Sequence, residues 1–464
     1  MVIGHSMTDK KIIRNVINKN GAKVYFIGIG GVSMSALALM LKERGLKIYG
    51  SDINKSSYTE MLERFGIIVN YSHGRAKIMS VMPDLVVYSL SISEENAEYI
   101  AAKKLGIPTV SRAELLGAVM CDYEIPIGVS GSHGKSTVTA LMAGVLNSQK
   151  IEPTVLCGAD ISAFGGYIHG KKKYLVYEAC EYGDSFLKFN PKIQIILNLD
   201  LDHTDYFDSE EKIRESFLRA ANLSEITIMC TDSRNLNLIK DRVKSRLYTF
   251  SKSDESDYRY EIKGSDKGRF SFDLYLGKDY IDSFSLGVMG EFNVPNAVST
   301  VIAAEILGVP RVKVKAALTE FRGLPRRLEI IKKAEFGDVF YDYAHHPCEI
   351  SAVREALYSA GYKRICAVFA PHTYSRTKAF LSDFARELSK FSKVYVTDIY
   401  GAREAPVPGI TSLALSEKIK TEGAESSPVS DDDVLNFLKK EKYDAIVLMG
   451  AGRLEKIKKY IIEC

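Results

Sequence analysis

The sequence has few features of secreted, metal-cluster or membrane-spanning proteins. Its seven cysteines form no CxxC pair and no other spacing typical of a metal site. Because their number is odd and several lie in apolar surroundings, we expect reduced thiols in a cytoplasmic protein. Residues 1–20 contain no apolar segment followed by small residues, so we expect no signal peptide.

The sequence also lacks an excess of charge and a long uninterrupted apolar run. Residues 24–41 carry no charge, but glycines and serines divide them into strand, turn and helix patterns rather than a membrane span. The net charge is +4, from 62 basic and 58 acidic residues, which favours neither a nucleic acid nor a membrane partner. A chain of 464 residues predicts about three domains of roughly 100–200 residues each.

A phosphate-binding loop is predicted by the stretch IGVSGSHGKSTVTALMA. Gly131 and Gly134 would let backbone N–H groups approach phosphate oxygens, and the dipole of the following helix would favour the anion. Lys135 could reach the outer phosphates, and the Ser136 hydroxyl could bind Mg²⁺. Val129 stands where the usual pattern has glycine, so the loop alone leaves open a turn without a ligand.

A second glycine turn, GIGGVS, follows the strand pattern of residues 23–29 and precedes a helix pattern. It differs from the dinucleotide fingerprint because Ser33 replaces the third glycine. Asp52 follows the next strand at the distance where an acid commonly meets a ribose. A tight turn without a ligand explains this pattern equally well, and His73 could be a surface histidine.

Two strand patterns in the middle of the chain end in residues suited to a metal. Glu178 follows residues 174–177, and His203 follows residues 193–197. Because the carboxyl ends of parallel strands share one edge, we expect both side chains to flank the phosphate loop. With Ser136 they could complete a Mg²⁺ shell around a triphosphate, although His203 could equally be structural.

The segment that follows has the alternating pattern of antiparallel strands. Residues 258–286 alternate with period two, which predicts an antiparallel meander without catalytic residues. The stretch GEFNVPN then leads into a predicted helix over residues 297–307, which Asn293 or Asn296 could cap.

The last third of the chain repeats the strand-to-loop pattern of a parallel sheet. Four strand patterns each end in a polar or glycine cluster, and these clusters include His345, His346 and His372. Arg326 and Arg327 lie in the preceding loop, a predicted domain junction, where the pair could bind an anion or face solvent.

Taken together, these motifs resemble those of the Mur ligase family. The matching segments, in family order, are GIGGVSMSALA, GSHGKS, EACEY, NLDLDH, GEFNVPNA, FRGLPRRLE, DYAHHP, PHTYSRT and DIYGAREAP. The resemblance covers nearly the whole chain and implies an α/β protein of three domains. It implies a Rossmann-like domain over residues 1–122, a P-loop ATPase-like domain with a mostly parallel sheet over 123–324, and a second Rossmann-like domain over 325–464.

The resemblance implies an enzyme that uses ATP and Mg²⁺ to convert a carboxylate into an acyl phosphate, which an amine then attacks. The motifs are most similar to those of members that join UDP-N-acetylmuramate to L-alanine in peptidoglycan precursor synthesis. Members that attach a tripeptide to the same sugar nucleotide share most motifs and stay an alternative. A nicotinamide-dependent dehydrogenase or a non-catalytic nucleotide-binding scaffold would leave the lysine, acid and imidazole without a function.

Position by position, the resemblance also implies site residues. The implied ATP contacts are Gly131, Ser132, His133, Gly134, Lys135, Ser136, Thr137, Asn296, Arg326, Arg327 and Asp342. The implied UDP-sugar contacts are Gly28, Gly30, Gly31, Val32, Asp52, His73 and Ser89. The implied metal ligands are Ser136, Glu178 and His203. The implied catalytic residues are Lys135, His345, His346, His372 and Arg376, and which histidine acts as the base stays open.

Overall fold

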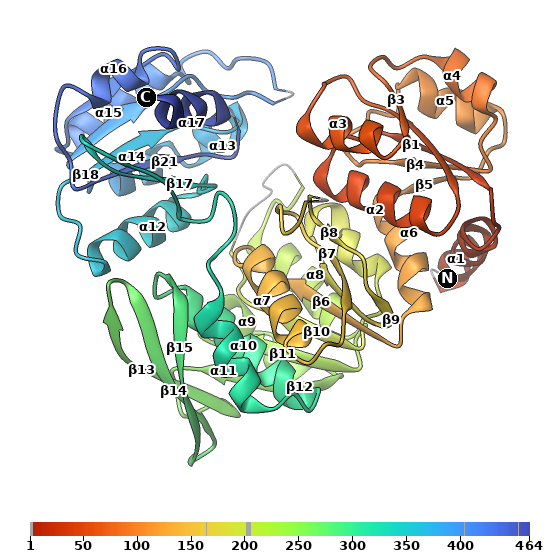
Figure 1. The fold of residues 1–464 in the computed structure, drawn as a ribbon, viewed down its shortest axis with the longest axis horizontal. Coiled ribbons are helices and arrows are strands. Elements are labelled where there is room, and N and C mark those ends of the chain that lie inside the picture. The colour runs from red at the N-terminus through yellow and green to blue at the C-terminus, as the bar shows by residue number, and fades with distance from the viewer. Residues whose placement is uncertain (1–2, 164, 201–205, 403, 453) are drawn as a thin grey trace. The chain divides into compact units, whose positions relative to one another are not determined.

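The computed structural model describes residues 3–163, 165–200, 206–402, 404–452 and 454–464, with side chains from residue 10 onward. The chain has the predicted three-domain α/β fold, built on sheets of five, ten and six strands (Figure 1). By internal contacts it divides into two compact units, Met1–Arg259 with Val298–Ala317, and Tyr260–Ala297 with Leu318–Cys464. The residue limits given above for the three domains stay a prediction.

The N-terminal sheet is entirely parallel, with the strand order β3-β2-β1-β4-β5. Its strands are β1 (Lys23–Ile27), β2 (Lys47–Ser51), β3 (Ile68–Asn70), β4 (Leu85–Tyr88) and β5 (Thr109–Ser111). Its helices are α1 (Ile3–Ile17), α2 (Val32–Glu43), α3 (Ser57–Arg64), α4 (Arg75–Val81), α5 (Ala97–Lys104) and α6 (Arg112–Val119). Alternate residues of β1 bury opposite faces: Val24 and Phe26 pack with α1, α2 and α6, whereas Tyr25 and Ile27 pack with α4 and α5. Both faces are therefore covered, as a parallel sheet requires.

The central sheet continues this pattern in the first unit, with the strand order β12-β11-β10-β6-β9-β7-β8. Its strands are β6 (Ile125–Ser130), β7 (Pro153–Leu156), β8 (Tyr167–Ile168), β9 (Lys171–Glu178), β10 (Ile193–Ile196), β11 (Ile226–Cys230) and β12 (Arg246–Ser251). All neighbours pair in parallel except β7 and β8, which form a hairpin. Helix α7 (Lys135–Asn147) packs on β6, β7 and β9. Helix α8 (Glu210–Ala221) contributes to the same hydrophobic core as β10 and β11.

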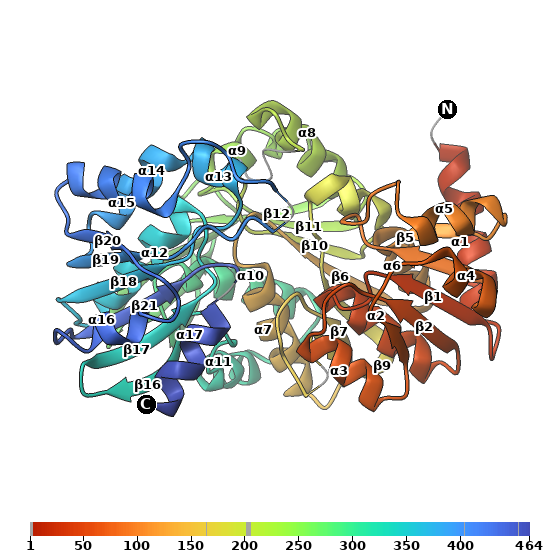
Figure 2. The ribbon, with the colours of Figure 1, turned by 90° about the horizontal axis from the view of Figure 1, so that it is seen from above.

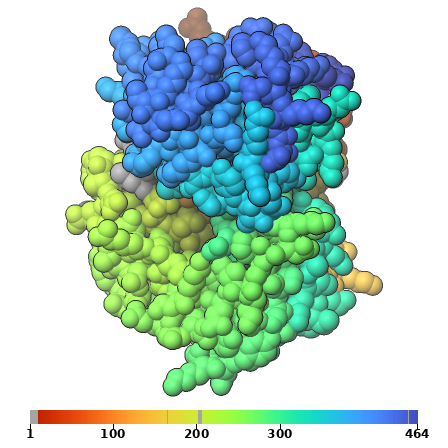
Figure 3. Space-filling view, turned by 90° about the vertical axis from the view of Figure 1, so that its left-hand side faces the viewer, coloured from red at the N-terminus to blue at the C-terminus, as the bar shows by residue number. Residues whose placement is uncertain are grey.

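The predicted meander is confirmed. Strand β13 (Tyr258–Asp266) starts in parallel with β12, and β14 (Arg269–Leu276) pairs antiparallel with β15 (Asp279–Met289). The tip of this hairpin, green in Figure 3, projects from the surface and exposes Leu276 and Tyr280.

The helix after the meander starts earlier than predicted. Helix α10 (Asn293–Ile306) begins before Pro295, because a proline in the first turn lacks only an N–H group that would have no helical partner. Asn293 and Asn296 therefore lie inside the first turn of α10 and do not precede it as caps. Helix α11 (Arg311–Glu320) follows.

The C-terminal sheet has the strand order β16-β17-β21-β18-β19-β20, with only the edge strand β16 antiparallel. Its strands are β16 (Glu329–Ala334), β17 (Gly337–Asp342), β18 (Ile365–Phe369), β19 (Lys393–Val396), β20 (Ser426–Pro428) and β21 (Ala445–Met449). Helices α12 (Pro347–Ser359), α14 (Leu381–Leu388) and α15 (Ser412–Thr421) cover one face, and α16 (Val434–Leu438) and α17 (Leu454–Glu463) the other (Figure 2). The short helix α13 (Tyr374–Ala379) leads into α14.

Two chain-wide expectations can be compared with the structure. All seven cysteines are free thiols. In the described part of the chain, every helix is too short or too polar to cross a lipid bilayer.

Candidate active site

The predicted phosphate loop connects β6 to α7, and the end of β10 fixes its shape. Gly131 and Gly134 have φ angles of 138° and 85°, in the region that favours glycine. A Cβ atom on Gly131 would lie 3.1 Å from the Cβ atom of Leu197. The Asn198 side chain accepts a hydrogen bond from the backbone N–H of His133 (2.8 Å) and donates one to its carbonyl (3.1 Å). The neighbouring strand end therefore holds the loop ready for an anion.

Lys135 is the buried cation of this loop. Its ammonium group donates to the carbonyl oxygens of Gly131 (2.5 Å) and Ser132 (3.2 Å) and to both carboxylate oxygens of Glu181 (3.1 and 3.2 Å). The Glu181 side chain is only 1% exposed. Burial by itself would lower the pKa of Lys135, but the neighbouring Glu181, Cys180 and Glu178 together outweigh it and raise the pKa above its ordinary value. Lys135 is therefore positively charged where phosphates would bind.

Two of the three predicted metal ligands, Ser136 and Glu178, both lie beside the thiol of Cys157. Ser136 is the second residue of α7 and is 4% exposed, and Glu178 ends β9. The Cys157 sulfur lies 3.8 Å from the Ser136 carbonyl oxygen and donates to Glu178 Oε1 at 3.1 Å. Gly158 N–H donates to the same oxygen at 2.5 Å.

His203, the third predicted ligand, lies outside the described residues. Among the residues that the structure does describe, no group of three or more His, Cys, Asp or Glu side chains could hold a metal. A hydroxyl and a carboxylate are nevertheless the oxygen donors that Mg²⁺ prefers, and phosphate oxygens and water usually supply its other ligands. Ser136 and Glu178 therefore fit a Mg²⁺ ion that is bound mainly through a nucleotide.

The predicted UDP-sugar residues gather at the carboxyl edge of the N-terminal sheet. The backbone N–H of Gly30 donates to Asp52 Oδ2 at 2.9 Å, and a Cβ atom on Gly30 would lie 2.8 Å from that oxygen. A Cβ atom on Gly28 would lie 3.5 Å from the Cβ atom of Ser89. His73 Nδ1 lies 3.1 Å from the hydroxyl of Ser51, the last residue of β2. Gly31 precedes α2 and Val32 begins it, so the whole predicted set belongs to one edge.

In the second unit, Tyr343 links the predicted nucleotide residues. The guanidinium carbons of Arg326 and Arg327 lie 5.1 and 5.2 Å from the centre of its ring. Asp342 accepts hydrogen bonds from the backbone N–H groups of Leu328 (2.7 Å) and Ala344 (2.7 Å). Burial raises the pKa of Asp342 to about 6, although Arg327 and these two N–H groups oppose the rise. Asp342 therefore already fixes the backbone around the two arginines.

The three candidate histidines have different surroundings. His346 is 6% exposed, and its Nδ1 accepts from the backbone N–H of Cys348 at 3.4 Å, so it caps α12. His372 Nδ1 lies 3.2 Å from a guanidinium nitrogen of Arg376, which can only donate. His345 Nδ1 lies 2.9 Å from the Tyr343 carbonyl oxygen and 3.4 Å from Glu349 Oε2, which can only accept. These partners place a proton on Nδ1 of His345 and the ring's lone pair on Nε2.

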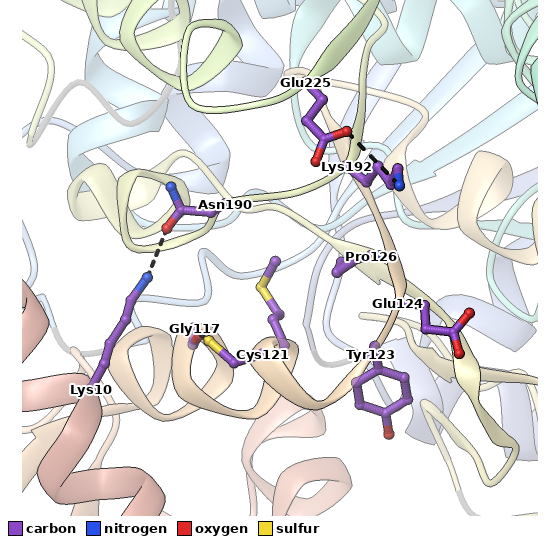
Figure 4. Close-up of a pocket in the computed structure, with 10 residues that line it drawn as sticks. Lys10, Gly117, Cys121, Tyr123, Glu124, Pro126, Asn190, Lys192 and Glu225 are labelled. Atoms are coloured by element: carbon purple, nitrogen blue, oxygen red, sulfur yellow. Dashed lines mark hydrogen bonds and ion pairs between the residues drawn. The ribbon is translucent and has the colours of Figure 1, made fainter.

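A cavity of about 200 Å³ lies elsewhere in the first unit (Figure 4). Both lysines that line it already have polar partners. Lys10 donates to Asn190 Oδ1 at 2.8 Å, and Lys192 lies 3.9 Å from Glu225 Oε2. None of the predicted site residues lines it.

Comparison with known proteins matches three family models to successive parts of this chain. The family model described as "Mur ligase family, catalytic domain" matches residues 23–124. "Mur ligase middle domain" matches residues 129–304, and "Mur ligase, glutamate ligase domain" matches residues 326–452. The chain belongs to the Mur ligase family.

Individual relatives of this Mur ligase extend over nearly its full length. It is 40% identical over 449 residues to UDP-N-acetylmuramate–L-alanine ligase of Caldanaerobacter subterraneus subsp. tengcongensis, covering 95% of this chain and 97% of the relative. It is also 40% identical, over 444 residues, to the ligase of the same name from Caldicellulosiruptor bescii, covering 94% and 97%.

A solved structure has the same fold. The crystal structure of UDP-N-acetylmuramate-alanine ligase from Thermotoga maritima superimposes with a TM-score of 0.82 at 25% identity, covering 95% of this chain and 98% of the other. A murein peptide ligase from Psychrobacter arcticus, at 23% identity and a TM-score of 0.70, shares the fold.

Glu181 and Tyr343 contact predicted site residues but were not themselves predicted from the sequence. Glu181 lies in the quoted segment EACEY, but nothing in the sequence distinguishes it from Glu178 as the partner of Lys135. Tyr343 lies in the segment DYAHHP, yet only the fold shows that its ring contacts two arginines. Asn296 is buried on α10, where its amide donates to Asn293 Oδ1 at 3.1 Å. The ligand contacts assigned to the individual residues stay predictions.

The Lys135–Glu181 ion pair gives a first test. Glu181→Gln would leave a buried ammonium without its counter-charge, at a cost of about 3–5 kcal/mol, so we expect a thermal midpoint several degrees lower. Mg-ATP should restore more stability to this variant than to the unchanged protein, because phosphates supply the missing negative charge. Thermal unfolding with and without Mg-ATP measures both effects.

The matched control is Glu152→Gln, which removes the carboxylate of an exposed ion pair with Lys171 (2.8 Å). This variant should change neither the thermal midpoint nor its shift with Mg-ATP. Equal midpoints and equal ATP shifts for Glu181→Gln and the unchanged protein would show that the pair does not hold Lys135.

Glu178 gives a second test, of the metal assignment. Glu178→Gln keeps an acceptor for Gly158 N–H but loses the charge, so the Mg²⁺ concentration for half-maximal activity should rise about tenfold or more. Cys157→Ser alters the neighbouring thiol only and should stay within about twofold. A Mg²⁺ titration in which Glu178→Gln behaves like Cys157→Ser would remove Glu178 from the metal site.

Proposed function

We propose that this protein uses ATP to form an amide between UDP-N-acetylmuramate and L-alanine, with release of ADP and phosphate. The observation that supports the ligase chemistry is the charged Lys135, held by Glu181 at the start of α7 beside the two glycines of the loop. The choice of substrates rests on the likeness to full-length ligases of that name.

The phosphate loop would perform the first step. Its N–H groups and Lys135 would hold the outer phosphates of ATP while a carboxylate oxygen of the sugar nucleotide takes the terminal phosphoryl group and ADP leaves. When bound, Mg²⁺ would neutralise charge on the phosphate oxygens, with Ser136 and Glu178 as protein ligands. Phosphorylation gives the carboxyl carbon a good leaving group, which an oxide is not.

The second unit would perform the amide-forming step. The amine of L-alanine attacks the acyl carbon, loses a proton and expels phosphate, so a base close to the amine assists. Of the three histidines, we assign this role to His345, because its Nδ1 faces two acceptors and its Nε2 therefore carries the lone pair. His372 with Arg376 would orient the amino acid, and His346 would keep α12 in place.

The remaining assignments follow from this reaction. The glycine turn at Gly28, with Asp52, His73 and Ser89, would hold the UDP part of the sugar nucleotide at the edge of the N-terminal sheet. Arg326, Arg327 and Asp342 would contact ATP from the second unit. We place the reaction in the cytoplasm, where ATP is available and where seven free thiols stay reduced.

The third test is of the function itself. Phosphate release is measured with ATP, Mg²⁺ and UDP-N-acetylmuramate, together with L-alanine, glycine, L-serine or the L-alanyl-γ-D-glutamyl tripeptide. We expect the highest kcat/KM with L-alanine. Preference for the tripeptide would assign the recycling reaction instead. If neither the tripeptide nor any of the amino acids supports phosphate release, the proposal is overturned.

The fourth test separates the two nucleotide sites. Lys135→Ala should lower kcat by about 100-fold or more, because a cation that stabilises the transferring phosphoryl group is lost. UDP binding, measured by calorimetry, should stay within about twofold, since the predicted UDP-sugar residues lie at the edge of another sheet. Loss of UDP binding together with activity would indicate a general folding defect and would count against the role given to Lys135.

A further inference from the structure

Glu98 is a fully buried acid that the proposed reaction does not use. It lies in the first turn of α5 and is 0% exposed. A buried carboxylate is costly unless hydrogen bonds satisfy it, and an isolated one would not survive in this core. A carboxylate at this buried position therefore requires hydrogen-bond donors around it.

Four donors from three segments of the N-terminal domain meet this carboxylate. The Tyr25 hydroxyl donates to Oε1 at 2.8 Å, and the backbone N–H of Gly74 approaches the same oxygen at 3.4 Å. The Ser51 hydroxyl donates to Oε2 at 2.5 Å, and His73 Nδ1 lies 3.0 Å from Oε2. Burial, and after it the Glu98 carboxylate, raise the pKa of the Tyr25 hydroxyl above its ordinary value, so Tyr25 stays a donor.

These contacts determine how the His73 ring is held. A carboxylate can only accept, so Nδ1 of His73 must carry the proton of their shared hydrogen bond. The ring's other nitrogen, Nε2, has no hydrogen-bond partner within the described residues, and the side chain is 18% exposed. With Nδ1 committed to Glu98, Nε2 is the nitrogen that a ligand can reach.

The location of His73 points to a ligand rather than to packing alone. Ser51 is the last residue of β2, the next residue is Asp52, and Asp52 accepts from the glycine turn after β1. The strand order β3-β2-β1-β4-β5 reverses its direction between β1 and β4, and ligands of open parallel sheets bind at the carboxyl ends of the strands beside such a reversal. His73 and the glycine turn thus share one candidate binding edge.

We propose that Glu98 is a positioning residue for the sugar-nucleotide site. It holds His73 by Nδ1 and presents Nε2 to the bound uridine diphosphate moiety, while Ser51 contacts the same carboxylate oxygen as His73. This inference rests on the proposed function only in taking a UDP-sugar as the ligand of the N-terminal domain.

The experiment compares Glu98→Gln with two matched variants. Glu98→Gln keeps the size of the side chain but can turn an amide N–H toward His73 Nδ1, so the ring loses its fixed orientation. Tyr25→Phe removes a hydrogen bond from the other carboxylate oxygen and leaves the His73 contact intact. His73→Ala removes the group through which Glu98 is proposed to act.

We expect the Kd of UDP, measured by calorimetry, to rise about tenfold in Glu98→Gln, since a hydrogen bond to a charged group is lost. The KM for UDP-N-acetylmuramate should rise in parallel, while kcat and the KM for ATP change by less than about twofold. Tyr25→Phe should keep the Kd within about twofold. Glu98→Gln should have no added effect in a His73→Ala background, because both changes remove the same interaction.

A purely structural role predicts other results. If Glu98→Gln lowers the thermal midpoint and kcat and raises both KM values together, or if Tyr25→Phe has the same effect on UDP binding, the proposal is wrong. Should Glu98→Gln fail to fold, Ser51→Ala and His73→Ala in single and double combination test the same coupling. Additive effects of these two changes on the Kd of UDP would overturn it.

The two proposals fail in different ways. A protein that binds UDP through Glu98 and His73 but releases no phosphate would overturn the ligase assignment alone. A protein that ligates L-alanine but whose affinity for UDP is unchanged by Glu98→Gln would overturn this inference alone.

Discussion

Parallel strand pairing is the constraint on which the rest of this structure depends. When neighbouring strands run in the same direction, their carboxyl ends and the loops that follow them lie at one edge of the sheet. In the central sheet this brings the loop after β6, Glu178 at the end of β9 and Asn198 after β10 into one place. In the N-terminal sheet it brings the glycine turn after β1 beside Asp52 and Ser89. Residues separated by many positions in the chain can therefore share one ligand.

A second regularity is how basic side chains are held at these edges. In the central domain Glu181 pairs with Lys135, and in the N-terminal domain Glu98 holds His73. In the C-terminal domain Glu349 lies against His345. Each acid is more buried than, or as buried as, the base it supports. A fixed carboxylate orients a basic group and opposes the burial cost of its charge, which suits sites where phosphates or amines must be placed accurately.

The fold could be predicted from the sequence where local pattern and burial agree. Strands β1, β9 and β10 contain short apolar runs, and each was predicted within a few residues of its observed limits. Strands β7 and β8 were not predicted, because they have only four and two residues, and strands β11 and β12 were missed as well. The start of α10 was placed too late, at residue 297, whereas the helix accommodates Pro295 in its first turn.

The sequence by itself determined the α/β class, the glycine turns, the phosphate-loop lysine and the motifs that identify the family. These depend on local spacing, because backbone approach to a phosphate needs particular residues at particular offsets. Only the tertiary structure decided which acid pairs with Lys135, which histidine caps a helix, and that Glu98 lies behind His73. Such choices depend on burial and on hydrogen-bond partners that folding brings together from distant segments, and no local pattern encodes them.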